Sequence, residues 1–294
     1  MKQFLKKCQA NLIDARWNIG IADVDEELNI YNIRYVRHGH SFRESWFADP
    51  FVIDETDRDY IILAEEMLVN KSRGRIVRLT VNKADMGLSD FEVLLDLDTH
   101  LSFPNHIKTK DGIFLYPENG ASGELSFYRY GKTLEKCGVI LEKAVYDSTI
   151  CRIGDDYYLL ATEFANPNGN VLSVFISDNP LSGYRKIQEI SFPDNIARRG
   201  GNVFVNKGQF ISPAQVCNKY YGEVLSFQTI EIKDGKISLK EFKRIYPEGK
   251  MLSPGFHTWN FLPVSPNKVV VDGYRFGSKF FHDMYFKIRG LKEM

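Results

Sequence analysis

The chain has 294 residues, enough for one large domain or two small ones. Lys and Arg together number 38, as do Asp and Glu, so the formal net charge is zero and no long basic block supplies the phosphate neutralisation that nucleic acid requires. Hydrophobic residues make up 44% of the chain and aromatic residues 13%, which predicts a sizeable core and favours a β-rich protein.

Cysteine usage and the N-terminus predict a cytoplasmic protein with buried free thiols. No two cysteines are spaced as Cys-x-x-Cys and no histidine pair accompanies them, which speaks against a zinc site or a disulfide framework. Residues 1–10 are basic but lack the continuous apolar region of a secretory signal. No stretch is apolar enough to span a membrane, although attachment to a membrane partner stays open. The four cysteines are Cys8, Cys137, Cys151 and Cys217.

In chain order, residues 1–16 come first, and their near-helical apolar spacing predicts a short helix or a tail. Residues 17–22 alternate between apolar and polar side chains and predict a strand. From Asp49 on, a unit of a strand, a tight polar turn, a strand, a longer link and a third strand recurs five times. Asp111-Gly112 and Lys207-Gly208 are hairpin turns of such units.

The units begin near residues 49, 104, 147, 199 and 257, and the third strand of the last one is expected over residues 280–288. A small antiparallel sheet that repeats every 43 to 58 residues, roughly, is typical of the blades of a β-propeller. The sequence therefore predicts an all-β, five-bladed β-propeller over residues 17–294, with the strand at 17–22 closing the ring. A pair of β-sandwiches is the alternative fold, but it does not explain why polar residues recur at the start of each unit.

In a propeller the innermost strands line a central channel, so the residues that begin the units are expected to converge there. This makes one polar site from positions far apart in the sequence. The residues are Asp49, Asn105 or His106, Asp147, Arg198 or Arg199, and His257.

At these positions the chain resembles the five-bladed propellers of the arabinanase, levansucrase and invertase superfamily. There an Asp opens blade one, commonly as Asp-Pro, and acts as base or nucleophile; a second Asp supports it. Asp49-Pro50 and Asp147 match these positions. The Glu that serves as general acid is replaced by Arg198 and Arg199, which cannot act as ordinary acids but can hold a carboxylate or phosphate. The resemblance also implies that His257 can hold a hydrated channel ion, although no cage of carboxylates surrounds it in the sequence.

More narrowly, the chain is similar over residues 46–275 to the N-terminal propeller-like domain of plant glucosamine inositolphosphorylceramide transferases and its bacterial stand-alone relatives. This resemblance implies a part in assembling cell-surface polysaccharide or glycolipid. In the plant proteins a separate domain resembles the sugar transferase, and the present sequence is not expected to contain it. The motifs that carry the resemblance include Asp49-Pro50-Phe51, His100-Leu101-Ser102-Phe103-Pro104, Tyr116-Pro117-Glu118, Arg199-Gly200-Gly201, Pro213-Ala214-Gln215-Val216-Cys217 and Tyr221-Gly222.

Two functional hypotheses follow. In the first, the protein is a glycosyltransferase or a glycoside hydrolase-like enzyme with Asp49 as base or nucleophile, Asp147 in support, and Glu118, Glu163 or Glu66 in the place of the acid. A phosphate leaving group would need no strong acid, and Arg199 would then neutralise it. In the second, the propeller is catalytically silent and presents a glycan to a partner glycosyltransferase. A pure interaction scaffold, and a buried ion network of structural importance only, stay open.

The expected ligand is a carbohydrate or sugar phosphate, and no cofactor or metal is predicted apart from the ion near His257. Aromatic faces at the mouth of a channel suit sugar rings, although core packing is the alternative for each of them. The predicted substrate-binding residues are Arg199, Arg198, His106, Asn105, His257, Trp46, Trp259 and Gln215.

Overall fold

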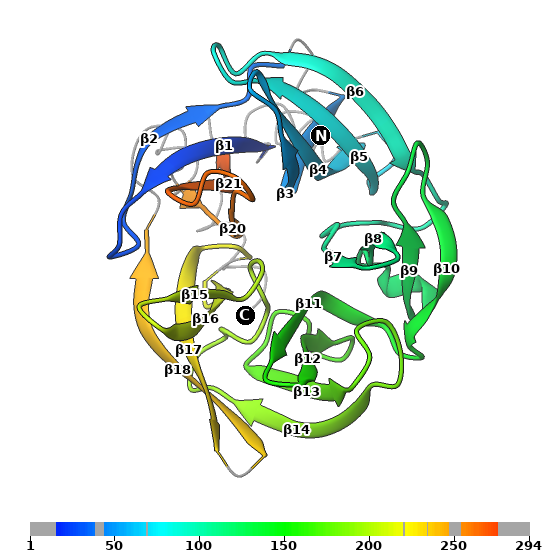
Figure 1. Cartoon of the computed structure of the whole chain (residues 1–294), viewed down its shortest axis with the longest axis vertical. Helices are drawn as coiled ribbons and strands as arrows, with labels where there is room; N and C mark the ends of the chain where they lie inside the picture. Colours follow the sequence, from blue (N-terminus) through cyan, green and yellow to red (C-terminus); the bar gives the residue numbers. More distant parts are fainter. Residues whose placement is uncertain are drawn as a thin grey trace, which may run out of the picture.

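The computed structural model describes residues 16–38, 44–68, 70–219, 221–233, 235–246 and 254–275. They form five antiparallel sheets arranged around a central axis (Figure 1). The predicted five-bladed propeller is confirmed. The helix or tail expected over residues 1–16 lies outside the described residues except for Arg16, which begins a strand, and the strand expected over residues 280–288 also lies outside them.

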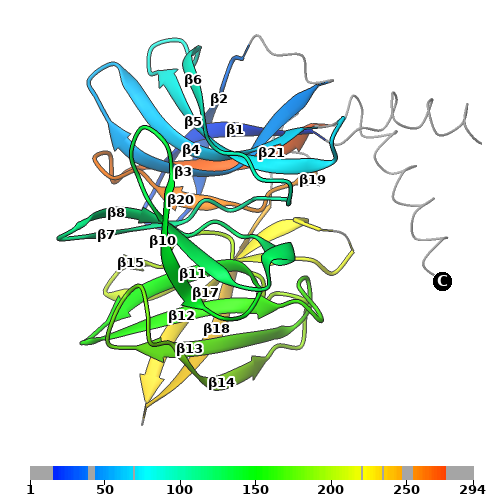
Figure 2. The ribbon, with the colours of Figure 1, turned by 90° about the vertical axis from the view of Figure 1, so that its right-hand side faces the viewer.

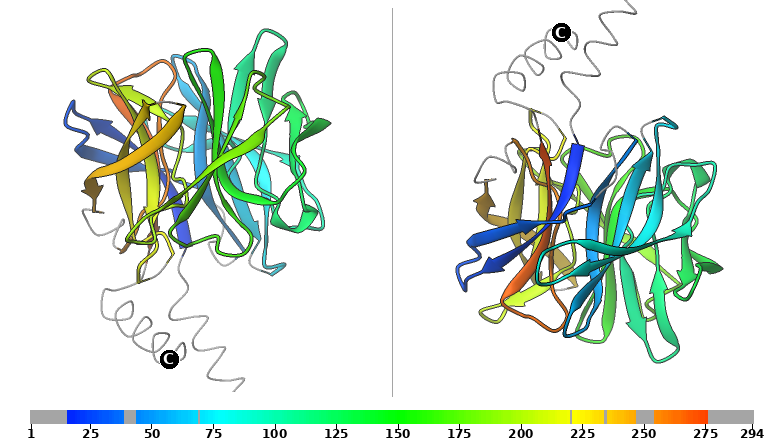
Figure 3. Two further views of the ribbon diagram at one scale, coloured as in Figure 1. Left: turned by 90° about the horizontal axis from the view of Figure 1, so that it is seen from below. Right: turned by 90° about the horizontal axis from the view of Figure 1, so that it is seen from above.

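Four of the blades contain four strands each, which follow one another along the chain from the axis to the rim (Figure 1). In side view the strands run across the ring between its two faces (Figures 2 and 3). The strands of these blades are β3 (Ser45–Glu55), β4 (Asp59–Leu68), β5 (Arg73–Asn82) and β6 (Leu88–Leu95); β7 (His106–Thr109), β8 (Gly112–Leu115), β9 (Leu125–Arg129) and β10 (Glu135–Leu141); β11 (Val145–Ile153), β12 (Asp156–Glu163), β13 (Val171–Ser177) and β14 (Arg185–Ser191); and β15 (Phe204–Asn206), β16 (Gln209–Val216), β17 (Val224–Lys233) and β18 (Lys236–Ile245).

The fifth blade joins the two ends of the described chain. It consists of β19 (Pro254–Gly255), β20 (Trp259–Phe261), β21 (Lys268–Arg275), β1 (Arg16–Val24) and β2 (Ile30–Tyr35). Strand β1 pairs with β21 from Arg16 opposite Arg275 to Asp23 opposite Lys268. The N-terminal strand therefore closes the ring, as predicted.

The hydrophobic core is divided among the junctions between blades. Five buried apolar clusters each combine side chains of two neighbouring blades. Phe47 and Ile62 of blade one, for example, cluster with Ile19 and Val270 of the fifth blade. Because both faces of a blade are covered in this way, polar side chains gather at the inner edge, near the axis, and at the rim.

Among the described residues no helix is long and apolar enough to cross a membrane. The described part of the chain contains one short 3-10 helix, η1 (Gly120–Ser122). Cys137, Cys151 and Cys217 are free thiols. Cys137 is exposed, which corrects the expectation that the thiols are all buried.

Candidate functional site

Two aspartates reach the axis through the same backbone feature. Between Ala48 and Phe51 two residues of β3 stand opposite one residue of β4, and between Tyr146 and Thr149 β11 has the same bulge against β12. Asp49 and Asp147 sit in these bulges with φ of 51° and 42°, a left-handed conformation that is unfavourable for a side chain. Backbone strain of this kind concentrates at functional sites, where the surrounding structure holds it in place.

The Asp49 carboxylate is held by neighbouring blades. Its Oδ2 accepts a hydrogen bond from the backbone N–H of Phe103 at 3.0 Å, and its Oδ1 accepts one from Thr258 Oγ1 at 3.1 Å. Nε2 of His257 lies 3.0 Å from the same Oδ1. Only 2% of Asp49 is exposed, so these donors take the place of water around its charge.

A second carboxylate, Asp272 on β21, lies on the other side of His257. Asp272 Oδ1 is 3.0 Å from His257 Nδ1 and accepts the N–H of Thr258 at 2.9 Å, while Oδ2 accepts the N–H of Asp49, also at 2.9 Å. Burial disfavours the charged imidazole ring, but the carboxylates of Asp272 and Asp49 outweigh it and raise the pKa of His257 to about 10. His257 is therefore an imidazolium between two carboxylates at neutral pH.

With His257 protonated, this arrangement does not fit a metal ion. One ligand atom each from Asp49, His257 and Asp272 lies within 4.8 Å of the others, as a metal site requires. However, both ring nitrogens of His257 face carboxylate oxygens, and a metal would need a deprotonated nitrogen with a free lone pair. The channel ion that the resemblance implies near His257 stays a prediction; the protonated ring itself carries a positive charge at this position.

The linkage between His257 and its carboxylates predicts a loss of stability in alkali. A raised folded-state pKa gives stabilisation that is complete below the unfolded value of about 6.5 and disappears as the pH approaches 10. We expect the free energy of unfolding, measured with urea, to fall by a few kcal/mol between pH 7 and pH 10. His257→Gln should be less stable at pH 7 and should flatten this fall; an unchanged slope in the variant would contradict the assignment.

Across the axis, Arg198 joins the two other predicted catalytic carboxyls. Its Nε lies 2.5 Å from Asp147 Oδ2, and its Nη2 lies 3.2 Å from both Asp147 Oδ1 and Glu118 Oε2. Glu118 Oε2 also accepts the N–H of Asp147 at 3.0 Å, and Gln215 Nε2 donates to Asp147 Oδ2. Burial raises the pKa of Glu118, while Arg198 opposes that rise. Asp147, Glu118, Arg198 and Gln215, all predicted site residues, thus form one cluster.

Two predicted substrate-binding residues are not brought to this cluster. Arg199 is fully buried, and its guanidinium donates to Ala197 O and Ile196 O, both at 2.9 Å, and to Ser212 Oγ at 3.0 Å. Burial among these neutral acceptors lowers the pKa of Arg199 to about 9. Trp259 is also fully buried, in the core between the fourth and fifth blades. These positions correct the expectation that Arg199 and Trp259 contact a ligand.

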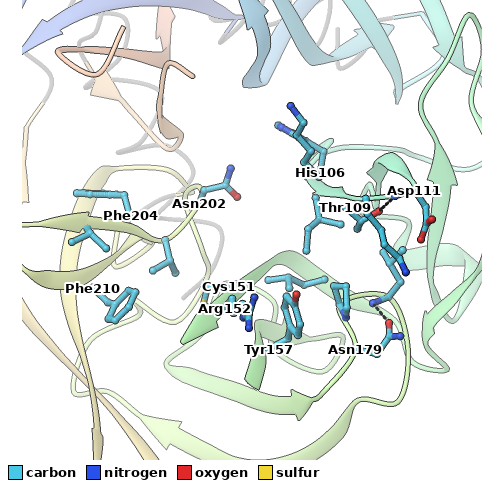
Figure 4. Close-up of a pocket in the computed structure, with 18 residues that line it drawn as sticks. His106, Thr109, Asp111, Cys151, Arg152, Tyr157, Asn179, Asn202, Phe204 and Phe210 are labelled. Atoms are coloured by element: carbon cyan, nitrogen blue, oxygen red, sulfur yellow. Dashed lines mark hydrogen bonds between the residues drawn. The ribbon is translucent and has the colours of Figure 1, made fainter. Parts of the chain in front are cut away.

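Asn105, His106 and Trp46 lie in different surroundings. Asn105 is fully buried, and its Nδ2 donates to Ser148 O at 3.2 Å, which links blades two and three. His106 lines a cavity of about 1040 Å³ between blades two, three and four (Figure 4), and burial lowers its pKa to about 4. The cavity meets β11 at residues 150–152, past Asp147, so it is separate from the carboxylate cluster. Trp46 is partly buried on β3.

The other two candidates for the acid, Glu163 and Glu66, each contact a cation. Hydrogen bonds from Lys143 and Lys186 outweigh the effect of burial on Glu163 and lower its pKa to about 2. Glu66 Oε2 lies 2.6 Å from Nε of Arg75. Neither side chain has the surroundings of a proton donor.

Sequence reasoning missed four residues near the axis. They are Asp272, Glu65, His100 and Tyr221. Glu65 is buried on β4, and Nε2 of His100 lies 3.5 Å from its Oε1. Tyr221 is 38% exposed, and its ring lies 5.2 Å from the Arg198 guanidinium and 5.2 Å from the His257 ring. Asp272 could have been found as the one acidic residue in an apolar strand, and Tyr221 and His100 belong to motifs already noted.

Comparison with solved structures places the fold. A thermostable family-43 glycoside hydrolase aligns with 81% of this chain and 89% of its own, at a TM-score of 0.55 and 13% identity. A family-43 β-1,3-galactosidase with galactodeoxynojirimycin aligns with 72% of this chain and 82% of its own, at a TM-score of 0.55 and 10% identity. At such identities the likeness concerns the propeller fold alone.

Sequence comparison identifies the family. Glucosamine inositolphosphorylceramide transferase 1 of Oryza sativa subsp. japonica is 28% identical over 218 residues, which cover 69% of this chain and 28% of that protein. The protein of the same name from Arabidopsis thaliana is 26% identical over 214 residues, 68% of this chain and 27% of its own. The chain thus matches about a quarter of the length of these relatives. The family model described as glucosamine inositolphosphorylceramide transferase 1, N-terminal, matches residues 35–260, and the chain therefore belongs to this family.

Proposed function

We propose that this protein acts on a carbohydrate by glycosyl transfer or cleavage at its central axis, with Asp49 as base or nucleophile. The observation that carries the proposal is the paired bulge that turns Asp49 and Asp147 inward in a strained conformation, each with its own set of donors. Catalysis at an anomeric carbon commonly uses two carboxyl groups in different environments. Here Asp49 is held by an imidazolium and Asp147 by a guanidinium.

The names of the relatives and the fold neighbours support a carbohydrate substrate. The relatives are named as transferases of glucosamine inositolphosphorylceramide, and the fold neighbours as glycoside hydrolases. Tyr221 adds an exposed aromatic face next to Arg198 and His257, of the kind that stacks on sugar rings. Since the hydrogen bonds of Arg199 go to neutral protein groups, it does not support the phosphate-holding role predicted from the sequence.

The test compares wild type with Asp49→Asn on free sugars, sugar phosphates and nucleotide sugars, glucosamine derivatives included, with product detected by mass spectrometry. We expect wild type to form product and Asp49→Asn to lose at least about 100-fold in rate while its far-ultraviolet circular dichroism stays unchanged. Asp54→Asn, an exposed aspartate on the same strand, is the matched control and should keep full activity. Turnover retained in Asp49→Asn would refute the assignment.

One observation favours the alternative, a glycan-binding propeller that presents its ligand to a partner glycosyltransferase. Arg198 engages Asp147 and Glu118 together, which leaves neither carboxyl free of a cation. In that case no compound of the panel yields product. A sugar would instead raise the melting temperature, because a ligand that binds only the folded state stabilises it.

A further inference from the structure

Glu65 carries a carboxyl group near the axis that the preceding proposal does not use. Glu65 lies on β4, paired with Ala48, the residue before Asp49. It is 5% exposed. Its backbone position on the strand next to β3 places it one strand out from the axis, at the level where the bulge turns Asp49 inward.

Glu65 differs from the other four carboxyls of the site in its hydrogen bonding. Asp49, Asp272, Asp147 and Glu118 each accept at least one hydrogen bond from a backbone N–H, a hydroxyl, an amide or Arg198. Among the described residues, Glu65 Oε1 has no hydrogen-bond partner. Burying a carboxylate without a donor is so costly that the group keeps its proton instead.

The balance of charges at the site also indicates that Glu65 keeps its proton. Five carboxyls lie at the site, whereas the cations described above for it are Arg198 and the His257 ring, and each of these already contacts two carboxyls. One more buried negative charge would be repelled by Asp49, its strongest charged neighbour. Burial, followed by Asp49, raises the pKa of Glu65 well above its usual range.

His100 and Gly74 form the surroundings of this carboxyl. The N–H of Gly74 donates to His100 Nδ1 at 2.8 Å, so in the neutral ring the hydrogen is on Nε2, the atom 3.5 Å from Glu65 Oε1. Burial lowers the pKa of His100, which favours that neutral ring. A Cβ atom at Gly74 would lie 2.3 Å from Glu65 Oε1, so the glycine leaves the space that the carboxyl occupies.

We propose that Glu65 is the proton donor of the site and that its substrate is a glycoside whose leaving group is a sugar or alcohol oxygen. The inference rests on the proposed function. As the bond from the anomeric carbon to that oxygen breaks, the oxygen keeps the electron pair and takes the proton of Glu65. Asp49, acting as base, takes a proton from the incoming water or acceptor hydroxyl, so the two carboxyls exchange states and return to their starting states through solvent. His100 Nε2–H then faces the new Glu65 carboxylate.

The first experiment measures the proton itself, without substrate. Infrared spectra of the full chain at pH 7.5 are compared for wild type, Glu65→Gln and Glu66→Gln. Glu66 is the matched control, since it is the next residue and is paired with Arg75. We expect a protonated-carboxyl C=O band in wild type that loses intensity in Glu65→Gln and is unchanged in Glu66→Gln. A band that is absent from wild type, or unchanged in Glu65→Gln, overturns the proposal.

The second experiment measures the dependence on the leaving group, with the 4-nitrophenyl and methyl glycosides of glucosamine as probes. Methoxide needs a proton to leave and nitrophenolate does not, so Glu65→Gln should lose about 10²- to 10⁴-fold on the methyl glycoside and far less on the nitrophenyl glycoside. His100→Gln should also lower the rate more on the methyl glycoside than on the nitrophenyl glycoside, but by less than Glu65→Gln does. Equal losses on both probes, or none, overturn the role of Glu65 alone. No release by wild type from either probe overturns it together with the proposed cleavage.

Discussion

Replacing Arg198 with methionine is expected to cost about 3–5 kcal/mol of the free energy of unfolding at pH 7, because it leaves Asp147 and Glu118 buried without their cation. Methionine keeps much of the side-chain volume, so the loss reports mainly on charge. Equilibrium unfolding in urea, followed by tryptophan fluorescence, measures it.

The pH dependence identifies the cause of that loss. Without Arg198, Glu118 loses the cation that opposes the rise of its pKa, so the variant should regain stability as the pH falls from 7 toward 5. Arg199→Met is the matched control: it also removes a buried guanidinium, but one whose acceptors are neutral, so its loss should not depend on pH in this range. Adding Asp147→Asn to Arg198→Met should recover part of the loss. A loss below about 1 kcal/mol would mean that the cluster contributes little to stability.

The fold was accessible from the sequence because each blade carries its own local signals. The Lys207-Gly208 turn has φ of 49° and 77°, as a tight hairpin turn requires. The run from Lys268 to Arg275 and the strand that begins at Arg16 also have the pattern of paired strands. Repetition of such units fixes the ring, and the ring in turn brings Asp49, Asp147 and His257 to one axis.

In two places the structure uses the neighbour of a residue that the sequence singled out. Arg198 rather than Arg199 reaches the carboxyls, and Glu65 rather than Glu66 lies against His100. Neighbouring side chains in extended backbone point to opposite sides, so a shift of one residue exchanges them. The bulges that set the register depend on tertiary contacts, such as the Phe103 N–H that holds Asp49, which no local pattern contains.

Substitution of Gly201 by alanine is expected to destabilise the fold more than the same substitution at Gly200 or Gly208. Gly201 has φ of 145°, and an added Cβ would lie 2.0 Å from the carbonyl oxygen of Trp259 and 3.0 Å from Asn260 Oδ1. Backbone strain and overpacking each cost about 1–3 kcal/mol, so together we expect a loss of at least about 3 kcal/mol in urea unfolding. Gly201 O also accepts the hydroxyl of Thr149 at 2.9 Å, so the strain falls where blades three, four and five meet.

Two further glycines separate crowding from backbone conformation. Gly208 has φ of 77° but no atom within 4 Å of an added Cβ, so Gly208→Ala should cost only the left-handed penalty of about 1 kcal/mol. At Gly200 the Cβ would lie 2.7 Å from Leu225 Cδ2, the end of a side chain that can move, and 2.8 Å from His257 O, which cannot move as easily. Gly200→Ala should therefore fall between the other two, and it keeps the comparison decisive if Gly201→Ala does not fold. Equal losses at Gly200 and Gly208 would show that the surroundings of Gly200 have room to shift.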